Sequence, residues 1–294
     1  MHAAKIKSVQ CFSAAGLHQM AYKEWGDENN PRVLICVHGL ARVSDDFDAL
    51  AQTFAEHYRV ICPDVVGRGR SGRLRNPALY QLIQYVSDMV TLIARLTANG
   101  ACQKLDWLGT SMGGLIGLLL AAQEGAPIRK LLLNDVGPTL DATALNRISQ
   151  YIGQDIVFPN YAVGALYIRE VSASFGPHSK EQWDKLARDV LVEQSDGQWK
   201  RHYDIALAAP FKLVTDEAAK EGEKMLWAAY DAITCPTLLV RGQNSDLLSV
   251  ATAQAMTQRG PKAQLIELPG IGHAPTFVHA DQIEIAKNFF LSEG

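Results

Sequence analysis

Several features are missing from this sequence of 294 residues, and each absence narrows the class of protein. The most apolar run, Leu115 to Ala122, is far shorter than the roughly 20 residues of a membrane-spanning helix, so we expect no membrane insertion. The first residues, MHAAKIKSVQCF, contain charges and no continuous apolar stretch, so we expect no secretory signal peptide. A formal net charge of -3 gives no reason to expect nucleic acid or an anionic membrane as a partner.

Cysteine is scarce and scattered. The five cysteines form no CxxC pair, so the sequence predicts neither a zinc site nor a dithiol redox site. Cys36 and Cys62 lie inside apolar runs, where a cysteine usually serves as a small core residue. We expect reduced thiols and a cytoplasmic protein.

Short apolar runs alternate with helical patterns along most of the chain. The continuous hydrophobicity of these runs is typical of strands buried on both faces of a parallel sheet. The predicted strands are Arg32–Val37, Arg59–Cys62, Lys104–Gly109, Lys130–Asn134, Thr237–Arg241 and Gln264–Leu268. Antiparallel edge strands are expected around Val9–Phe12 and Met20–Lys23.

Apolar residues spaced by three and four predict helices between the strands. The predicted helices are Ser44–Glu56, Leu79–Ala98, Met112–Glu124, Ser249–Arg259 and Asp281–Leu291. Strand and helix in alternation indicate an α/β protein with a doubly wound, mostly parallel sheet.

This rhythm stops between about Pro138 and Tyr230, where helical stretches follow one another without a clear strand. We therefore expect a core domain of residues 1–137 and 231–294 and a helical insertion of residues 138–230. Aromatic residues are concentrated in the insertion, including Trp183, Trp199 and Trp227. They either form a small core of its own or line an apolar pocket.

The sharpest motif is the G-x-S-x-G pentapeptide from Gly109 to Gly113, with Ser111 at its centre. It follows a predicted strand and begins an apolar helix, which is the context in which this motif presents a nucleophilic serine. The start of the helix adds free N–H groups and a positive dipole beside the serine. A purely structural serine is the alternative that this context disfavours.

A serine hydroxyl needs a base, and the base needs an acid to orient it. His273 follows the last predicted strand and is the expected base, whereas His38 fits a role in loop structure better. Asp246, after the strand TLLVR, is the expected acid, with a helix cap as its alternative role. Asp135, after the strand LLLN, is the second candidate for the acid.

Two backbone donors are expected to form the oxyanion hole. The N–H of Met112 follows the nucleophile, and the N–H of Leu40 lies in the loop that begins at His38-Gly39. Arg42, in the same loop, either binds a substrate carboxylate or pairs with Asp45 or Asp46, and we favour the pairing.

One further motif points elsewhere. Gly67 to Gly72 matches G-x-G-x-x-G after a strand, which in a dinucleotide-binding unit would begin a helix. The loop-like residues Arg73 to Pro77 follow instead, so we interpret this stretch as a glycine-rich loop beside the active site, braced by Asp64.

In order along the chain, these motifs resemble the serine-triad branch of the α/β-hydrolase superfamily, and the resemblance spans about Val9 to Phe290. The motifs that carry it are His38-Gly39, Asp64-x-x-Gly-x-Gly-x-Ser71, Gly109-x-Ser-x-Gly113, Arg241-Gly-x-x-Ser-Asp246 and Gly272-His273. The resemblance implies an α/β-hydrolase fold with an eight-stranded, mostly parallel sheet flanked by helices, and a helical cap inserted after the sixth strand. It also implies the triad Ser111, Asp246 and His273, the oxyanion donors Leu40 and Met112, and no cofactor or metal.

We therefore expect a carboxylesterase-like serine hydrolase that cleaves a small apolar ester through an acyl-enzyme. A carbon–carbon bond hydrolase of the same fold is an alternative, although Ala274-Pro275 follows the base where those enzymes usually carry tryptophan. A ligand receptor with little turnover is another, and a homodimer is left open.

Overall fold

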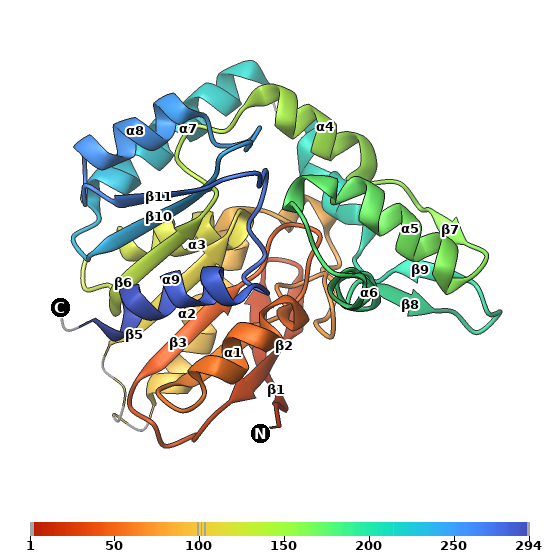
Figure 1. The fold of residues 1–294 in the computed structure, drawn as a ribbon, viewed down its shortest axis with the longest axis horizontal. Coiled ribbons are helices and arrows are strands. Elements are labelled where there is room, and N and C mark those ends of the chain that lie inside the picture. The colour runs from red at the N-terminus through yellow and green to blue at the C-terminus, as the bar shows by residue number, and fades with distance from the viewer. Residues whose placement is uncertain (1–2, 99, 101, 103, 214, 293–294) are drawn as a thin grey trace.

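In the computed structural model, residues 3–98, 100, 102, 104–213 and 215–292 are described. Their centre is an eight-stranded sheet with the strand order β1-β2-β4-β3-β5-β6-β10-β11 (Figure 1). Its strands are β1 (Lys5–Ser13), β2 (Gly16–Trp25), β3 (Val33–Val37), β4 (Arg59–Pro63), β5 (Leu105–Thr110), β6 (Ile128–Asn134), β10 (Thr237–Gly242) and β11 (Gln264–Leu268). β2 pairs antiparallel with β1 and β4, and the other pairs are parallel. The predicted α/β-hydrolase sheet is thus confirmed, including its antiparallel edge.

Helices cover both faces of the sheet and explain why its central strands are apolar throughout. One face packs against α2 (Leu82–Thr97), α3 (Met112–Ala121), α7 (Asp216–Ala232) and α8 (Val250–Gln258). The other face packs against α1 (Asp48–Phe54) and α9 (Ala280–Leu291). Every side chain of β3, VLICV, is buried between these layers. A strand covered on both faces has no solvent side that would require alternation.

Between β6 and β10 the chain leaves the sheet and forms the insertion, which lies on the right of Figure 1. Its helices are α4 (Ala142–Ile152), α5 (Tyr161–Val171) and α6 (Lys180–Arg188). It also contains a small antiparallel sheet of β7 (Val157–Phe158), β9 (Trp199–Arg201) and β8 (Leu191–Glu193). The expectation of a strandless insertion was therefore wrong, because strands of two or three residues are too short to show a hydrophobic period.

The predicted end of the insertion was also too late. α7 lies inside the range 138–230, yet it packs against α3, and Tyr230 is buried in the main core. Short 3₁₀ helices occupy loops, namely η1 (Ser44–Phe47), η2 (Pro77–Leu79), η3 (Ala173–Phe175), η4 (Ile205–Ala208) and η5 (Pro210–Leu213).

The insertion has a small core of its own, built around Phe158, Ile168 and Leu191, against which Trp199 packs. Trp227 belongs to α7 and packs on the main core. Trp183 lies against the ring of His178, with 4.8 Å between ring centroids. Of these three tryptophans, Trp199 packs on the insertion's own core, as the structural alternative expected, and Trp227 packs on the main core instead.

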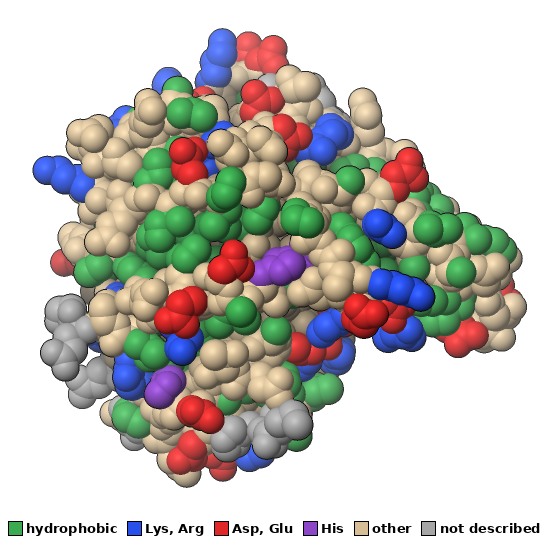
Figure 2. Space-filling model, in the orientation of Figure 1, with side chains coloured by type: hydrophobic (Ala, Val, Ile, Leu, Met, Phe, Trp, Pro, Cys, Tyr) green, Lys and Arg blue, Asp and Glu red, His purple; other side chains and the backbone are tan. Residues whose placement is uncertain are grey.

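The surface is mixed in charge, and Figure 2 shows acidic and basic side chains interspersed over the face in view. Apolar side chains gather at the outer end of the insertion, around α5, β7 and β8 (Figures 1 and 2). Val157, Val163, Leu166 and Val192 are exposed there. Within the described residues, no helix combines the length and the apolar character needed to cross a membrane.

Candidate active site

Ser111 lies at the sharp turn between β5 and α3, with φ 52° and ψ -117°. A positive φ is strained for a residue with a side chain, and such strain is typical of a nucleophile elbow. The two glycines of the pentapeptide make the turn sterically possible. A Cβ on Gly109 would collide with the backbone of Gly113, and one on Gly113 would collide with the carbonyl of Val37.

The hydroxyl of Ser111 meets the imidazole of His273, with 2.9 Å between Oγ and Nε2. The other ring nitrogen, Nδ1, lies 2.7 Å from Oδ2 of Asp135, whose side chain is fully buried. Asp135 also accepts hydrogen bonds from the N–H of Gly242, at 2.9 Å, and from the hydroxyl of Ser245, at 2.7 Å. With the Nδ1 proton directed to a carboxylate, Nε2 is free to accept the serine proton.

The expectation that Asp246 orients His273 was wrong. Asp246 points to solvent with 48% of its side chain exposed and forms an ion pair with Arg147, at 2.6 Å. Its neighbour Ser245 is the residue of this loop that reaches Asp135. Asp135, the second candidate, follows β6 directly and turns inward with φ 56°. A residue one step beyond a strand end stays over the sheet, whereas Asp246 lies beyond the turn closed by Ser245 N–H and the Gly242 carbonyl.

The two expected oxyanion donors come from the residue that follows Ser111 and from the loop after β3, whose Gly39 lies beside Ser111. Met112 is the first residue of α3, where a backbone N–H has no partner inside the helix. Leu40 lies in the loop after β3, and no acceptor among the described residues takes its N–H. Both groups are thus available to a developing oxyanion.

Sequence reasoning missed Arg68, which contacts both of these residues. This fully buried side chain donates to the carbonyl of Leu40 at 2.9 Å and to Sδ of Met112 at 3.3 Å. Its third contact is the carbonyl of Val66, at 2.7 Å. Because its donors reach the loop after β3 and helix α3 as well as its own loop, Arg68 links the two segments that carry the expected oxyanion donors.

His38 has the structural role that its position suggested. Its Nδ1 lies 2.7 Å from the carbonyl of Gly39, and its Nε2 accepts the N–H of Val65 at 3.0 Å. Complete burial lowers the pKa of this imidazole to about 4, so it is neutral at pH 7. It ties the loop after β3 to the glycine-rich loop after β4.

The glycine-rich loop from Gly67 to Gly72 is not followed at once by a helix, since α2 begins only at Leu82. Asp64 braces the loop as expected: its carboxylate accepts the N–H of Arg70 at 2.9 Å and that of Ser44 at 2.8 Å. Arg42 likewise follows the favoured interpretation, with a bidentate pair to Asp46 at 2.8 and 2.6 Å.

The insertion reaches the loop that carries His273. The hydroxyl of Ser174 donates to the carbonyl of His273 at 2.7 Å, and the carbonyl of Ser174 accepts the N–H of Gly272 at 2.7 Å. From the core, the amide of Asn134 donates to the carbonyl of Pro275 at 2.8 Å. These contacts are not visible in the sequence, because each joins segments far apart in the chain.

A cavity of about 110 Å³ lies over Ser111, between the core and the insertion. Its lining is largely apolar, with Leu40 and Phe47 from the core and Ile148, Tyr151 and Phe175 from the insertion. Such a lining suits an acyl chain or an apolar alcohol. None of the three tryptophans considered above lines it.

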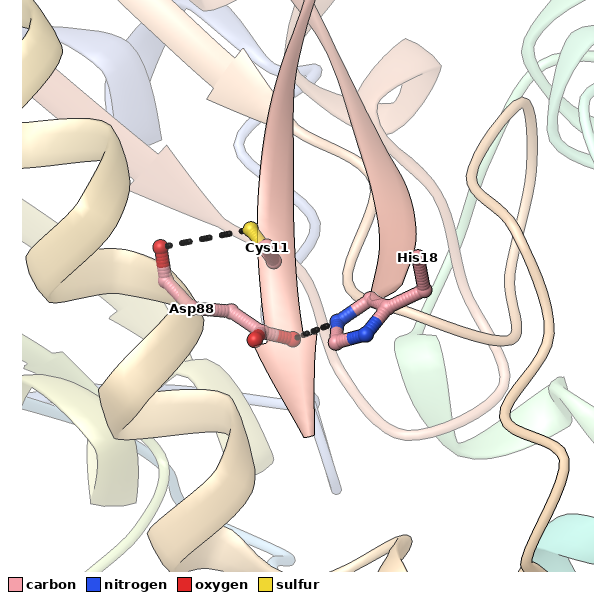
Figure 3. Close-up of side chains that lie close together, drawn as sticks. All are labelled: Cys11, His18 and Asp88. Atoms are coloured by element: carbon pink, nitrogen blue, oxygen red, sulfur yellow. Dashed lines mark hydrogen bonds and ion pairs between the residues drawn. The ribbon is translucent and has the colours of Figure 1, made fainter. Parts of the chain in front are cut away.

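A separate cluster of Cys11, His18 and Asp88 has donor atoms within 4.8 Å of one another (Figure 3). Figure 3 shows the carboxylate of Asp88 directed to His18 Nε2, at 2.9 Å, and the thiol directed to the main-chain carbonyl of Asp88, at 4.0 Å. Burial raises the pKa of the Cys11 thiol to about 12, which opposes the thiolate that a metal ion requires. The cluster joins the β1–β2 hairpin to α2 by hydrogen bonds.

Known proteins share this architecture along nearly the whole chain. A 3-hydroxybutyrate-oligomer hydrolase of Cupriavidus necator is 52% identical over 289 residues, which are 97% of each chain. A pimeloyl-[acyl-carrier protein] methyl ester esterase of Xanthomonas campestris is 26% identical over 88% of this chain and 94% of its own. The crystal structure of an alpha/beta hydrolase from Novosphingobium aromaticivorans has a TM-score of 0.83 and 34% identity, and covers 98% of each chain.

The model of the alpha/beta hydrolase family matches residues 34–286, a range that includes Ser111, Asp135 and His273. The expectation of an enzyme of the hydrolase class is confirmed by this match and by the 52% identical hydrolase. From its fold, its motifs and its relatives alike, this chain belongs to the alpha/beta hydrolase family.

Proposed function

We propose that this chain hydrolyses carboxylic esters through Ser111, with His273 as the base and Asp135 as the acid of the triad. The observation that carries the proposal is the continuous chain of contacts from Ser111 Oγ to His273 and from His273 to Asp135. The similarity to a 3-hydroxybutyrate-oligomer hydrolase supports short linear oligoesters of hydroxy acids as its substrates.

The reaction follows from the positions of these groups. Ser111 Oγ attacks the ester carbonyl while Nε2 of His273 takes its proton, and the N–H groups of Leu40 and Met112 receive the negative oxygen. His273 then protonates the departing hydroxyl end of the oligomer. Water, deprotonated by the same nitrogen, releases the acyl group and restores Ser111.

Replacement of Ser111 tests the nucleophile. Ser111→Ala should abolish hydrolysis of 4-nitrophenyl butyrate and of 3-hydroxybutyrate oligomers while the melting temperature changes little. A fluorophosphonate probe should label the wild-type chain at Ser111, as located by peptide mass spectrometry. Labelling of another serine in stoichiometric amount would refute the assignment. Tight binding of an oligomer to the wild-type chain without turnover would favour the receptor alternative.

The identity of the acid is tested by a matched pair of variants. Asp135→Asn should lower kcat about 10⁴-fold, as the same Asp-to-Asn change does in a serine protease with a Ser-His-Asp triad. The amide no longer fixes the imidazole in the required tautomer. Asp246→Asn should retain turnover of a neutral ester, because Asp246 does not touch His273. The reverse order of the two effects would contradict the role of Asp135.

A further inference from the structure

The cavity over Ser111 is bordered by charged side chains as well as apolar ones, and these charges differ in how far they are neutralised. Arg42 and Asp46 line the cavity together and pair with each other, with only 13% and 16% of their side chains exposed. Arg42 also donates to the carbonyl of Leu186 at 3.1 Å. This arginine is therefore occupied and shielded, and it offers little to a substrate.

Arg147 lines the same cavity from α4, and its side chain is more exposed than that of Arg42. Among the described residues its guanidinium makes one ion pair, through Nη2 to Oδ2 of Asp246, and 47% of its side chain is exposed. Asp246 does not line the cavity. The remaining N–H groups of Arg147 are thus open to a second anion that approaches from the cavity side, since a guanidinium carries five N–H donors in a planar fork.

The neighbours of Arg147 indicate where the rest of a ligand that carries such an anion would lie. Ile148 and Tyr151, on the same helix, form the apolar wall of the cavity beside it. Arg147 and Tyr151 are four residues apart, so they lie on one face of α4. A ligand held here would have a negatively charged end and an apolar body that extends toward Ser111.

We propose that Arg147 binds the free carboxylate of the substrate, with Asp246 as its counter-ion when no substrate is bound. This inference rests on the proposed ester hydrolysis at Ser111 and adds to it the residue that recognises the carboxylate carried by the acid or alcohol part of the ester. A linear oligomer of a hydroxy acid has one such group, at one end. Binding that end at Arg147 would select the ester bond that is placed at Ser111.

The test compares two substrates that differ only in charge: the linear dimer of 3-hydroxybutyrate, and the same dimer with its terminal carboxylate converted to a carboxamide. Release of the monomer by each is followed by chromatography. Arg147→Gln should lower the ratio of kcat/KM for the acid to that for the amide by on the order of 10-fold, mainly through KM. The factor is modest because a half-exposed charge pair is screened by water.

Asp246→Asn should change the same ratio in the opposite direction, because it removes the carboxylate that competes for Arg147. Arg188→Gln is the matched control: Arg188 is also an exposed arginine of the insertion paired with an aspartate, Asp184, but it does not line the cavity. It should leave the ratio unchanged.

The two proposals fail in different ways. If the wild-type chain cleaves neither the dimers nor 4-nitrophenyl butyrate, the proposed ester hydrolysis is wrong. If it cleaves both dimers but Arg147→Gln and Asp246→Asn leave the acid-to-amide ratio at the wild-type value, only the carboxylate site is wrong. An equal loss for both dimers in Arg147→Gln would likewise overturn it, since that result indicates a structural role.

Discussion

Arg68 shows how one side chain can link the separate parts of a site. Among the described residues no carboxylate lies within ion-pair distance of it, although it is completely buried. Its charge is met by two backbone carbonyls, the sulfur of Met112 and the ring face of Tyr85, whose centroid is 4.9 Å away. Burial of a charge without an ionic partner is costly, so we expect this residue to serve the site rather than the stability of the fold.

Arg68→Met should therefore lower kcat by at least about 10-fold, because the backbones of Leu40 and Met112 lose their common support. The free energy of unfolding should be unchanged or higher, since an apolar side chain of similar length removes the buried charge. Steady-state kinetics and urea denaturation measure the two effects. A variant that loses stability but keeps the wild-type kcat would show that Arg68 is only structural.

The sequence could predict some of these residues and not others, for local reasons. Ser111 was predictable because strand, glycine, serine and helix are contiguous, and His273 because it follows the last strand. Asp135 and Asp246 each follow a strand, and the two strands, β6 and β10, are neighbours in the sheet. The choice between them depends on how each loop turns, which residue types alone do not determine.

Among the structural elements, the insertion is distinguished by its hydrogen bonds to the loop that carries His273. The 3₁₀ helix η3 places Ser174 where its side chain and its backbone both bond to the loop, at His273 and Gly272. His178 adds a third contact, from its Nε2 to the hydroxyl of Thr276 at 2.9 Å. The position of His273 thus depends on an element outside the core.

Ser174→Ala should lower kcat several-fold with a smaller change in KM, because the imidazole of His273 is less well fixed relative to Ser111. The rate of fluorophosphonate labelling should fall by the same factor. Ser179→Ala is a useful control, since Ser179 caps α6 in the same insertion. It should cost about 1 kcal/mol of stability and leave kcat unchanged. Equal kcat in both variants would contradict the positioning role of Ser174.

The elements of the core were easier to predict than those of the insertion. A strand such as β3 is buried on both faces, so its apolar run is continuous and visible in the sequence. The strands β7, β8 and β9 have at most three residues, and β7 pairs with β9, more than forty residues further along the chain. α7 resembles the other helices of the insertion in composition, and only its packing against α3 assigns it to the core.

At the scale of the whole molecule, buried neutral histidines should make the fold sensitive to acid. Burial lowers the pKa of His38 to about 4 and lowers that of His178 and of His202. In the unfolded chain these groups titrate near 6.5. Their contribution to stability is therefore complete above pH 6.5 and is lost as the pH falls from there toward 4. Asp189 acts in the opposite direction, because burial raises its pKa to about 6.

With three histidines against the two aspartates whose pKa burial raises, Asp189 and Asp88, the free energy of unfolding should be lower at pH 5 than at pH 7. Urea denaturation at constant ionic strength measures it. In His202→Gln the difference between the two pH values should be smaller than in the wild-type chain. A free energy of unfolding that stays constant or rises from pH 7 to pH 5 would contradict this account.

The order of Ser111, Asp135 and His273 along the chain has a consequence for synthesis. Ser111 and Asp135 precede the insertion, whereas His273 comes 138 residues after Asp135. A nascent chain therefore carries its serine and its aspartate through the translation of the insertion, of β10 and of β11 before it contains the histidine. In the proposed mechanism such a chain has no group to deprotonate Ser111. In that mechanism, the growing polypeptide gains the base for Ser111 only once translation has passed β11.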